Sequence, residues 1–63
     1  MNSYRLYLTD AQGHFQRVAL LECHDDAAAI AEAERRAAGQ SAELWQAGRM
    51  VKTWRAVAAQ ALD

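Results

Sequence analysis

The second half of the chain constrains the fold most, because a helical pattern is followed almost at once by a tight hairpin. Asp26–Ala38 is rich in alanine, and Asp25 directly before it is a residue type that often caps a helix. Ala42–Trp54 then predicts two strands joined by a two-residue turn, Ala47-Gly48. One helix beside paired strands in so short a chain predicts an α+β domain.

The two-residue turn also predicts which side chains share a face of the sheet. It sets Glu43 opposite Lys52, Leu44 opposite Val51 and Trp45 opposite Met50. Because successive side chains point to opposite faces, we expect Leu44 and Val51 on one face and Trp45, Met50 and Trp54 on the other. A longer or bulged turn would instead move Trp45 into the core.

The first half of the chain predicts a second hairpin. Tyr4–Thr9 alternates between larger apolar and more polar side chains, as a half-buried strand does. Asp10–Gly13 follows as a turn, in which Asp10 can accept hydrogen bonds from the backbone that follows. Gly13 can adopt the positive φ that a type I turn with a bulge requires.

The alternation in the returning strand, His14–Glu22, is blurred. Phe15 and Leu21 fall on one parity, whereas Val18 and Leu20 fall on the other. Either a bulge shifts the register or the strand is buried on both faces. The elements run β-β-α-β-β, and we expect one helix packed on a four-stranded, mostly antiparallel sheet whose strand order stays open.

The helix is expected to contribute little apolar surface to the core. Its predicted inner stripe consists of Ala27, Ile30, Ala33, Glu34 and Ala37. Ile30 is the only large apolar side chain in that stripe. Gly39 stands where a left-handed residue is expected to end the helix.

The length of 63 residues predicts one small domain over residues 1–54. The tail, residues 55–63, has a composition that also allows a short helix. A chain of this size buries only about 60% of its unfolded surface, so its core is thin. With Cys23 as the single cysteine, no internal disulfide can support it. Self-association, most simply as a dimer, is the expected support.

Charge and hydropathy argue against two classes of partner. A net charge of −1 provides no overall field that attracts phosphate backbones or anionic lipid. The apolar runs are far shorter than the roughly 18 residues that a membrane span needs. Met1–Arg5 lacks the basic and apolar segments of a secretory signal, and the lone cysteine suits a reducing compartment. We therefore expect a cytoplasmic protein without membrane contact.

Several segments resemble a known group of proteins. Tyr4–Asp10, Gly13-His14, Asp25–Ala31 and Glu43–Trp45 are similar to segments of very small uncharacterised ββαββ proteins from alphaproteobacteria. The resemblance covers residues 4–54. It implies a cytoplasmic bacterial protein, and it carries no catalytic residues to transfer.

Cys23 and its neighbours are the nearest approach to a reactive or metal-binding group. Cys23 and His24 could be joined by His14 or Asp25, but no C-x-x-C or H-x-x-x-H spacing supports a metal site. The carboxylates of Asp25 and Asp26 also disfavour a thiolate at Cys23. We expect no catalytic residue, no metal and no cofactor, and the protein is not expected to be an enzyme.

The remaining features favour a small interaction module. Trp45, Met50 and Trp54 are the expected contact surface, because tryptophan and methionine are enriched at interfaces. The alternative is nucleic-acid binding by an aromatic and basic sheet face comprising Arg5, Tyr7, Trp45, Arg49, Lys52 and Trp54. The acidic balance of charge and the absence of an RNP-like motif make that alternative the weaker one.

Overall fold

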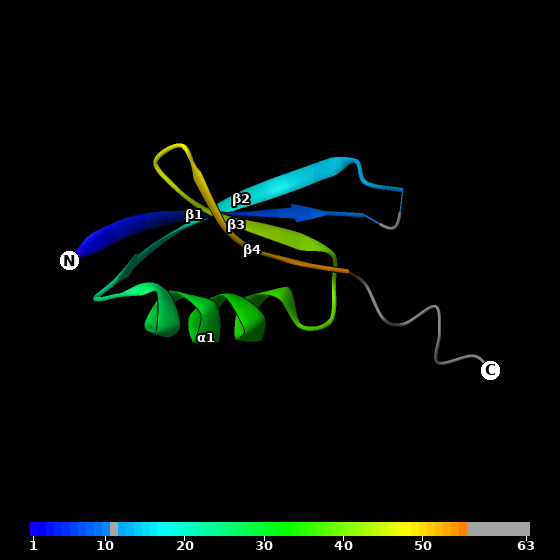
Figure 1. Cartoon of the computed structure of the whole chain (residues 1–63). Coiled ribbons are helices and arrows are strands. Elements are labelled where there is room, and N and C mark those ends of the chain that lie inside the picture. Colours follow the sequence, from blue (N-terminus) through cyan, green and yellow to red (C-terminus); the bar gives the residue numbers. More distant parts are fainter. Residues whose placement is uncertain (11, 56–63) are drawn as a thin grey trace.

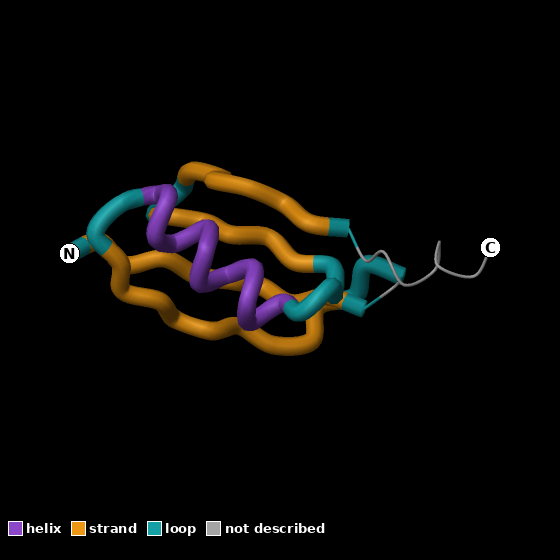
Figure 2. Tube along the Cα trace, turned by 90° about the horizontal axis from the view of Figure 1, so that it is seen from below, coloured by secondary structure: helices purple, strands orange, loops and turns teal. Residues whose placement is uncertain are grey.

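The predicted α+β fold is confirmed by a computed structural model, which describes residues 1–10 and 12–55. The elements are β1 (Asn2–Thr9), β2 (Phe15–Cys23), α1 (Asp26–Ala37), β3 (Ala42–Gln46) and β4 (Arg49–Trp54). The four strands form one antiparallel sheet in the order β2-β1-β3-β4. The helix covers one face of this sheet and crosses the strands obliquely (Figure 1, Figure 2). Of the predicted tail, residues 55–63, all but Arg55 lies outside the described residues.

The core lies between the central strands and the helix. Its buried members are Tyr4, Leu6, Leu8, Leu21, Ala29, Ala33, Ala37, Ala42 and Leu44. Three of these are alanines at four-residue spacing on α1, and their small side chains let the helix lie close to the sheet. The large apolar side chains come from the strands, as expected from the alanine-rich helix.

The inner stripe of the helix differs from the prediction at two positions. Ala33 and Ala37 are buried and Ile30 is half-buried, as predicted, but Ala27 is exposed and Ala29 is buried in its place. Glu34 is also exposed, at the edge where β4 meets the helix. Asp26 in the first helical turn bonds the sheet residues Tyr4 and Arg49, and Ala29 is buried on the side that faces the sheet. The buried stripe of Ala29, Ala33 and Ala37 still follows helical periodicity but is offset from the predicted one.

The first hairpin turn forms as predicted. Asp10 Oδ1 accepts hydrogen bonds from the backbone N–H groups of Gln12 at 3.0 Å and His14 at 2.8 Å. These bonds to the charged form lower the pKa of Asp10, that from His14 most strongly. Gly13 takes a φ of 86°, in the left-handed region that a residue with a side chain rarely adopts.

A β-bulge explains the blurred pattern of the second strand. Leu8 pairs with Arg17 but Thr9 pairs with Phe15, so Gln16 is an extra residue in β2. The bulge brings Phe15 onto the same face as Val18. Leu21 and Ala19, which pack in or against the core, lie on the opposite face, toward the helix. Of the two explanations left open by the sequence, the bulge is the one that holds.

A second bulge changes the predicted pairing of the other hairpin. Trp45 pairs with Met50, as predicted, but Leu44 pairs with Lys52 rather than with Val51. Val51 is the extra residue. The predicted pair of Glu43 with Lys52 is therefore also wrong.

This bulge moves Trp54 to the opposite face. Trp54 pairs with Ala42, packs against the core cluster and donates its indole N–H to Glu34 of the helix. The prediction that Trp54 shares a face with Trp45 is wrong, because one extra residue reverses the parity of every side chain beyond it. Trp45 and Met50 precede the extra residue and keep the predicted face.

The helix ends one residue earlier than predicted. It ends at Ala37, and Ala38 already has left-handed backbone angles of φ 52° and ψ 45°. Its N–H donates to the carbonyl oxygen of Glu34 at 3.1 Å, and Gly39 follows with a φ of 85°. A non-glycine residue therefore occupies a conformation that disfavours a Cβ atom.

Two alanine-to-glycine substitutions should have opposite effects on stability. Ala38→Gly removes the steric cost of a left-handed alanine, so we expect the free energy of unfolding to rise by about 0.5–1 kcal/mol. Ala31→Gly, at an exposed position inside α1, should lower it by about 1 kcal/mol. Urea denaturation measures both. A loss of stability in both variants would show that Ala38 is not left-handed in solution.

Candidate functional site

The helix-free face of the sheet, called the open face below, is the candidate site. Alternation and register place on it Arg5, Tyr7 and Thr9 of β1, Phe15, Val18 and Leu20 of β2, Glu43 and Trp45 of β3, and Met50 and Thr53 of β4. No element of the described chain covers this face (Figure 1). The opposite face carries the core.

Large apolar side chains are exposed on the open face. Leu20 is 63% exposed, Phe15 59%, Val18 49% and Met50 39%. Apart from Met1, these four are the large apolar side chains that are exposed among residues 1–10 and 12–55. Such a concentration on one face of a small protein is typical of a binding surface.

Trp45 lies in a row of side chains that crosses the whole sheet. Leu20 pairs with Arg5, Arg5 pairs with Trp45, and Trp45 pairs with Met50. Trp45 is half-buried, and its indole N–H donates to Glu43 Oε1 at 3.1 Å. The structure thus brings Trp45 and Met50 together on the open face, as the sequence predicted, and not in the core.

Sequence reasoning missed the contribution of β2 to this face. Val18 and Leu20 are on it through regular pairing with Tyr7 and Arg5, and Phe15 joins them because of the bulge at Gln16. The available signal was the blurred alternation itself, since apolar residues that change parity within one strand indicate a bulge. The apolar surface is therefore wider than the predicted one, because it extends from β3 and β4 across β1 to β2.

Two shallow hollows lie on the open face. The first, of about 470 Å³, is lined by Tyr7, Thr9, Gly13, Phe15, Glu43, Trp45 and Ala47. The second, of about 500 Å³, is lined by Ser3, Arg5, Leu20, Gln46 and Ala47. Ala47 lines both, so the two hollows adjoin. The carboxylate of Glu43 lines the first hollow, and the guanidinium of Arg5 lines the second.

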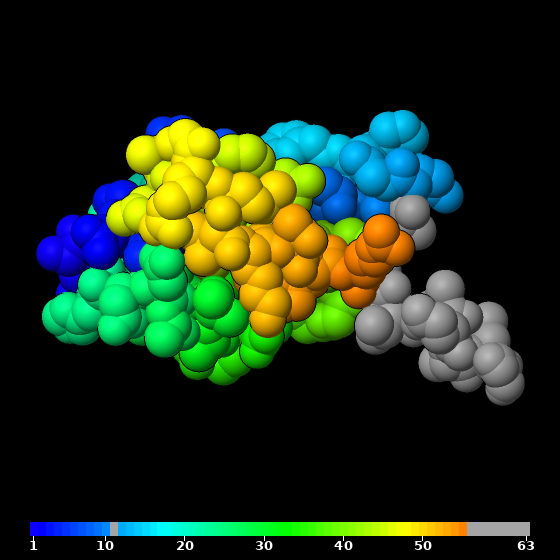
Figure 3. All heavy atoms as spheres, viewed as in Figure 1, coloured from blue at the N-terminus to red at the C-terminus, as the bar shows by residue number. Residues whose placement is uncertain are grey.

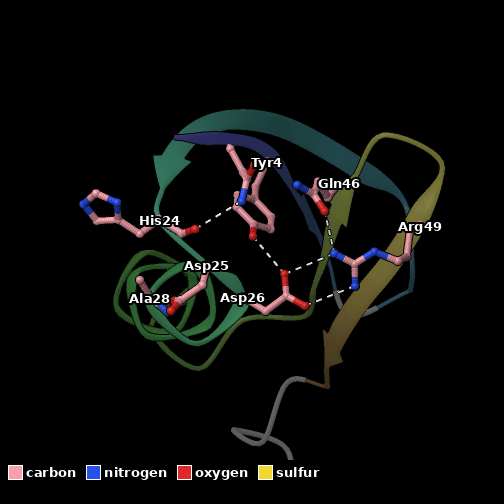
Figure 4. A network of polar contacts seen from close by, with 8 residues as sticks. Tyr4, His24, Asp25, Asp26, Ala28, Gln46 and Arg49 are labelled. Carbon is pink, nitrogen blue, oxygen red and sulfur yellow. Dashed lines mark hydrogen bonds and ion pairs between the residues drawn. The ribbon is translucent and has the colours of Figure 1, made fainter.

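On the other face, a polar cluster ties the second hairpin to the helix. Asp26 accepts a hydrogen bond from the Tyr4 hydroxyl at 2.8 Å and two from the Arg49 guanidinium, each at 3.1 Å (Figure 4). Arg49 also donates to Gln46. Hydrogen bonds from Arg49 and then Tyr4 lower the pKa of Asp26, whereas burial is the main cause that raises the pKa of Tyr4. This cluster joins the first turn of α1 to β1 and β4.

A second contact joins β4 to the middle of the helix. Glu34 accepts hydrogen bonds from the Trp54 indole N–H and the Lys52 ammonium, both at 3.3 Å. These bonds, that from Trp54 first, lower the pKa of Glu34. The Lys52 nitrogen also lies 5.5 Å from the Trp54 ring centroid. In Figure 3 the atoms of β4 lie directly against those of α1.

These contacts divide the six residues predicted for nucleic-acid binding. Arg49, Lys52 and Trp54 are engaged with the helix, on the side opposite the open face. Arg5, Tyr7 and Trp45 remain on the open face, beside the carboxylate of Glu43. The predicted grouping on a single face is therefore wrong.

Acid should weaken the polar cluster. The pKa of Asp26 lies below its ordinary value of 3.8, so the folded state binds fewer protons than the unfolded state near that pH. Ionised Asp26 therefore stabilises the folded state at pH values above the pKa that Asp26 has in the unfolded chain. This stabilisation is lost as the pH falls through the lower pKa that Asp26 has in the folded state. We expect the free energy of unfolding to fall as pH decreases from about 5 towards 2.

The contribution of Asp26 can be isolated by substitution. Asp26→Asn should flatten this pH dependence, because the titrating partner of Arg49 is removed. Glu22→Gln, at an exposed position of β2, should retain a pH dependence of stability closer to that of the wild-type protein. Urea denaturation at a series of pH values measures both variants. An Asp26→Asn variant with the wild-type pH dependence would contradict the prediction.

The residues considered for metal binding or nucleophilic catalysis do not converge. His14 precedes β2 and pairs with Asp10 at 3.5 Å, whereas Cys23 ends β2 and is half-buried. The backbone carbonyl of His24 accepts a hydrogen bond from Asn2. No group of three or more histidine, cysteine, aspartate or glutamate side chains suited to a metal occurs in the described part of the chain. The absence of catalysis and of a metal stays a prediction.

Comparison with protein-family models, curated proteins and solved structures finds no match. The resemblance to the small alphaproteobacterial proteins therefore stays a prediction. Among the described residues, no helix has both the length and the apolar character that a membrane crossing requires.

Proposed function

We propose that this protein is a small non-catalytic interaction module of the bacterial cytoplasm that forms a homodimer through its open face. The observation that carries the proposal is the concentration of exposed Phe15, Val18, Leu20 and Met50 on one face. When a partner covers such a face, its apolar side chains are removed from water, and this favours association. The cytoplasmic location rests on the lone Cys23 and on the resemblance described above.

The small core favours a second copy of the same chain as the partner. Of the nine buried core residues, Ala29, Ala33, Ala37 and Ala42 contribute little apolar area each. Fully burying a leucine or phenylalanine side chain is worth about 1.5–3 kcal/mol. Covering the open face with a second copy would therefore add substantially to the stability of so small a domain.

The charges on the open face are self-complementary. Arg5 and Glu43 occupy neighbouring rows, since Arg5 pairs with Trp45 and Glu43 pairs with Tyr7. A two-fold axis parallel to the face, perpendicular to the line that joins Arg5 to Glu43 and passing midway between them, brings Arg5 of each copy opposite Glu43 of the other. Opposite charges then meet twice in one symmetric interface.

Light scattering on matched lysine variants tests the proposal. The wild-type protein should show the mass of a dimer at high concentration. Leu20→Lys places a charge on the open face and should weaken the dimer by at least about tenfold. The variant should still fold, because Leu20 is 63% exposed in the single chain.

Ala31→Lys supplies the control, because it adds the same charge on the exposed side of α1. It should leave the mass unchanged. A monomeric wild-type protein at high concentration, or a Leu20→Lys variant that remains a dimer, would refute the proposal. Salt-sensitive binding of single-stranded RNA that depends on Arg5 would favour the nucleic-acid alternative instead.

A further inference from the structure

Two tryptophans of this chain make the same contact on opposite faces of the sheet. On the helix side, the Trp54 indole N–H donates to Glu34 at 3.3 Å. On the open face, the Trp45 indole N–H donates to Glu43 at 3.1 Å. Each pair combines the electron-rich face of an indole ring with a carboxylate, two groups that attract a cation.

On the helix side, the chain supplies that cation itself. The Lys52 ammonium lies 5.5 Å from the Trp54 ring centroid and 3.3 Å from Glu34 Oε2. On the open face, Glu43 forms no ion pair with any described residue. Arg5 lines the adjoining hollow and not the one that contains Glu43.

The hollow beside Trp45 is more aromatic than the helix-side contact. It is also lined by Tyr7 and Phe15, whose ring centroids lie 5.8 Å apart with their planes at 60°. Tyr7 pairs with Glu43, which places its ring on the diagonal from Trp45. Three aromatic side chains from three different strands therefore line the same hollow as one carboxylate.

We propose that this hollow of about 470 Å³ binds an organic cation of the alkylammonium class, with Glu43 and Trp45 as its principal contacts. The rings attract positive charge but have no lone pairs that ligate a metal ion. Their apolar walls favour an ammonium carrying methyl groups over a strongly hydrated one, because the methyl groups contact carbon without loss of hydration.

A pair of ligands with the same shape and different charge tests the site. Choline is a quaternary ammonium, and 3,3-dimethylbutan-1-ol is its uncharged counterpart. Each is titrated into the full chain while the indole N–H resonances of Trp45 and Trp54 are followed by NMR. Choline should shift the Trp45 resonance in a saturable way and leave that of Trp54 in place. The neutral alcohol should bind about two- to fivefold more weakly.

Matched glutamine variants test the role of the carboxylate. Glu43→Gln keeps an acceptor for Trp45 but removes the charge, and it should weaken choline binding about two- to fivefold. Glu34→Gln makes the same change on the helix side and should leave choline binding unchanged. Equal affinity for the two ligands, or unchanged affinity in Glu43→Gln, would overturn the proposal.

The cation site and the proposed dimer share the open face and the Glu43 carboxylate, so a dimer with Arg5 opposite Glu43 competes with choline. In the wild-type chain, choline binding should therefore weaken as the protein concentration rises, and a variant with a weakened dimer tests the site separately. The titration is repeated in Leu20→Lys, whose substitution lies in the second hollow and outside the cation site. Choline binding by this variant would support the cation site whether or not the wild-type protein associates. Failure of this variant to bind choline would refute the site and leave the light-scattering result standing.

Discussion

Replacing Leu44 by alanine is expected to leave most of the protein unfolded at room temperature. Leu44 is fully buried at the centre of the core and lies on a central strand. A buried leucine-to-alanine change costs about 2–5 kcal/mol, whereas a single core in so small a domain rarely supplies more than about 3–5 kcal/mol. Circular dichroism and urea denaturation of the variant measure the loss.

Leu20→Ala provides the matched control for this prediction. It deletes the same atoms from a side chain that is 63% exposed, so it should change the stability of a single chain by no more than about 0.5 kcal/mol. Both variants are compared at a protein concentration low enough for the chain to be monomeric. A Leu44→Ala variant as stable as Leu20→Ala would show that the core differs from the one described above.

Trp45→Ala is expected to abolish most of the dependence of the melting temperature on protein concentration. A dimer melts at a higher temperature when it is more concentrated, because association stabilises the folded state by mass action. Trp45 lies in the row that crosses the open face, and covering one such side chain is worth about 1.5–3 kcal/mol. Melting curves over a hundredfold range of concentration measure the effect.

Trp54→Ala makes the same chemical change on the helix side and separates core from interface. Trp54 packs against the core and bonds Glu34, so its loss should lower the melting temperature at every concentration. The concentration dependence should survive in this variant. If Trp54→Ala removed that dependence and Trp45→Ala preserved it, the contact surface would lie on the helix side.

Local signals in the sequence were sufficient to predict the elements. Asp25 accepts a hydrogen bond from the Ala28 N–H at 2.9 Å, as expected of a helix cap. The Asp10 turn forms with Gly13 at positive φ, and Ala47-Gly48 separates the last two strands. Each of these features depends on residues within about four positions of one another. These elements could therefore be predicted from interactions between residues close together in the sequence.

The two bulges were decided by packing between segments distant in the sequence. The bulge at Gln16 depends on how β2 pairs with β1, and that at Val51 depends on how β4 meets β3. A bulge changes which side chains face the helix, so its energy depends on what those side chains meet there. The sequence indicated a possible bulge in β2, where the alternation is blurred, whereas for the second hairpin it left open only a longer or bulged turn.

The candidate site shows the same division. By itself, the sequence determined the order of the elements and the α+β class, because these follow from local periodicity and turn residues. It predicted Trp45 and Met50 on a helix-free face, but a longer or bulged turn that moves Trp45 into the core stayed open until the pairing with Met50 was seen. Only the tertiary structure decided that Phe15 joins that face and that Trp54 leaves it for Glu34, twenty residues away. Side-chain parity is local, but an extra residue in a strand is stabilised by contacts with the rest of the fold.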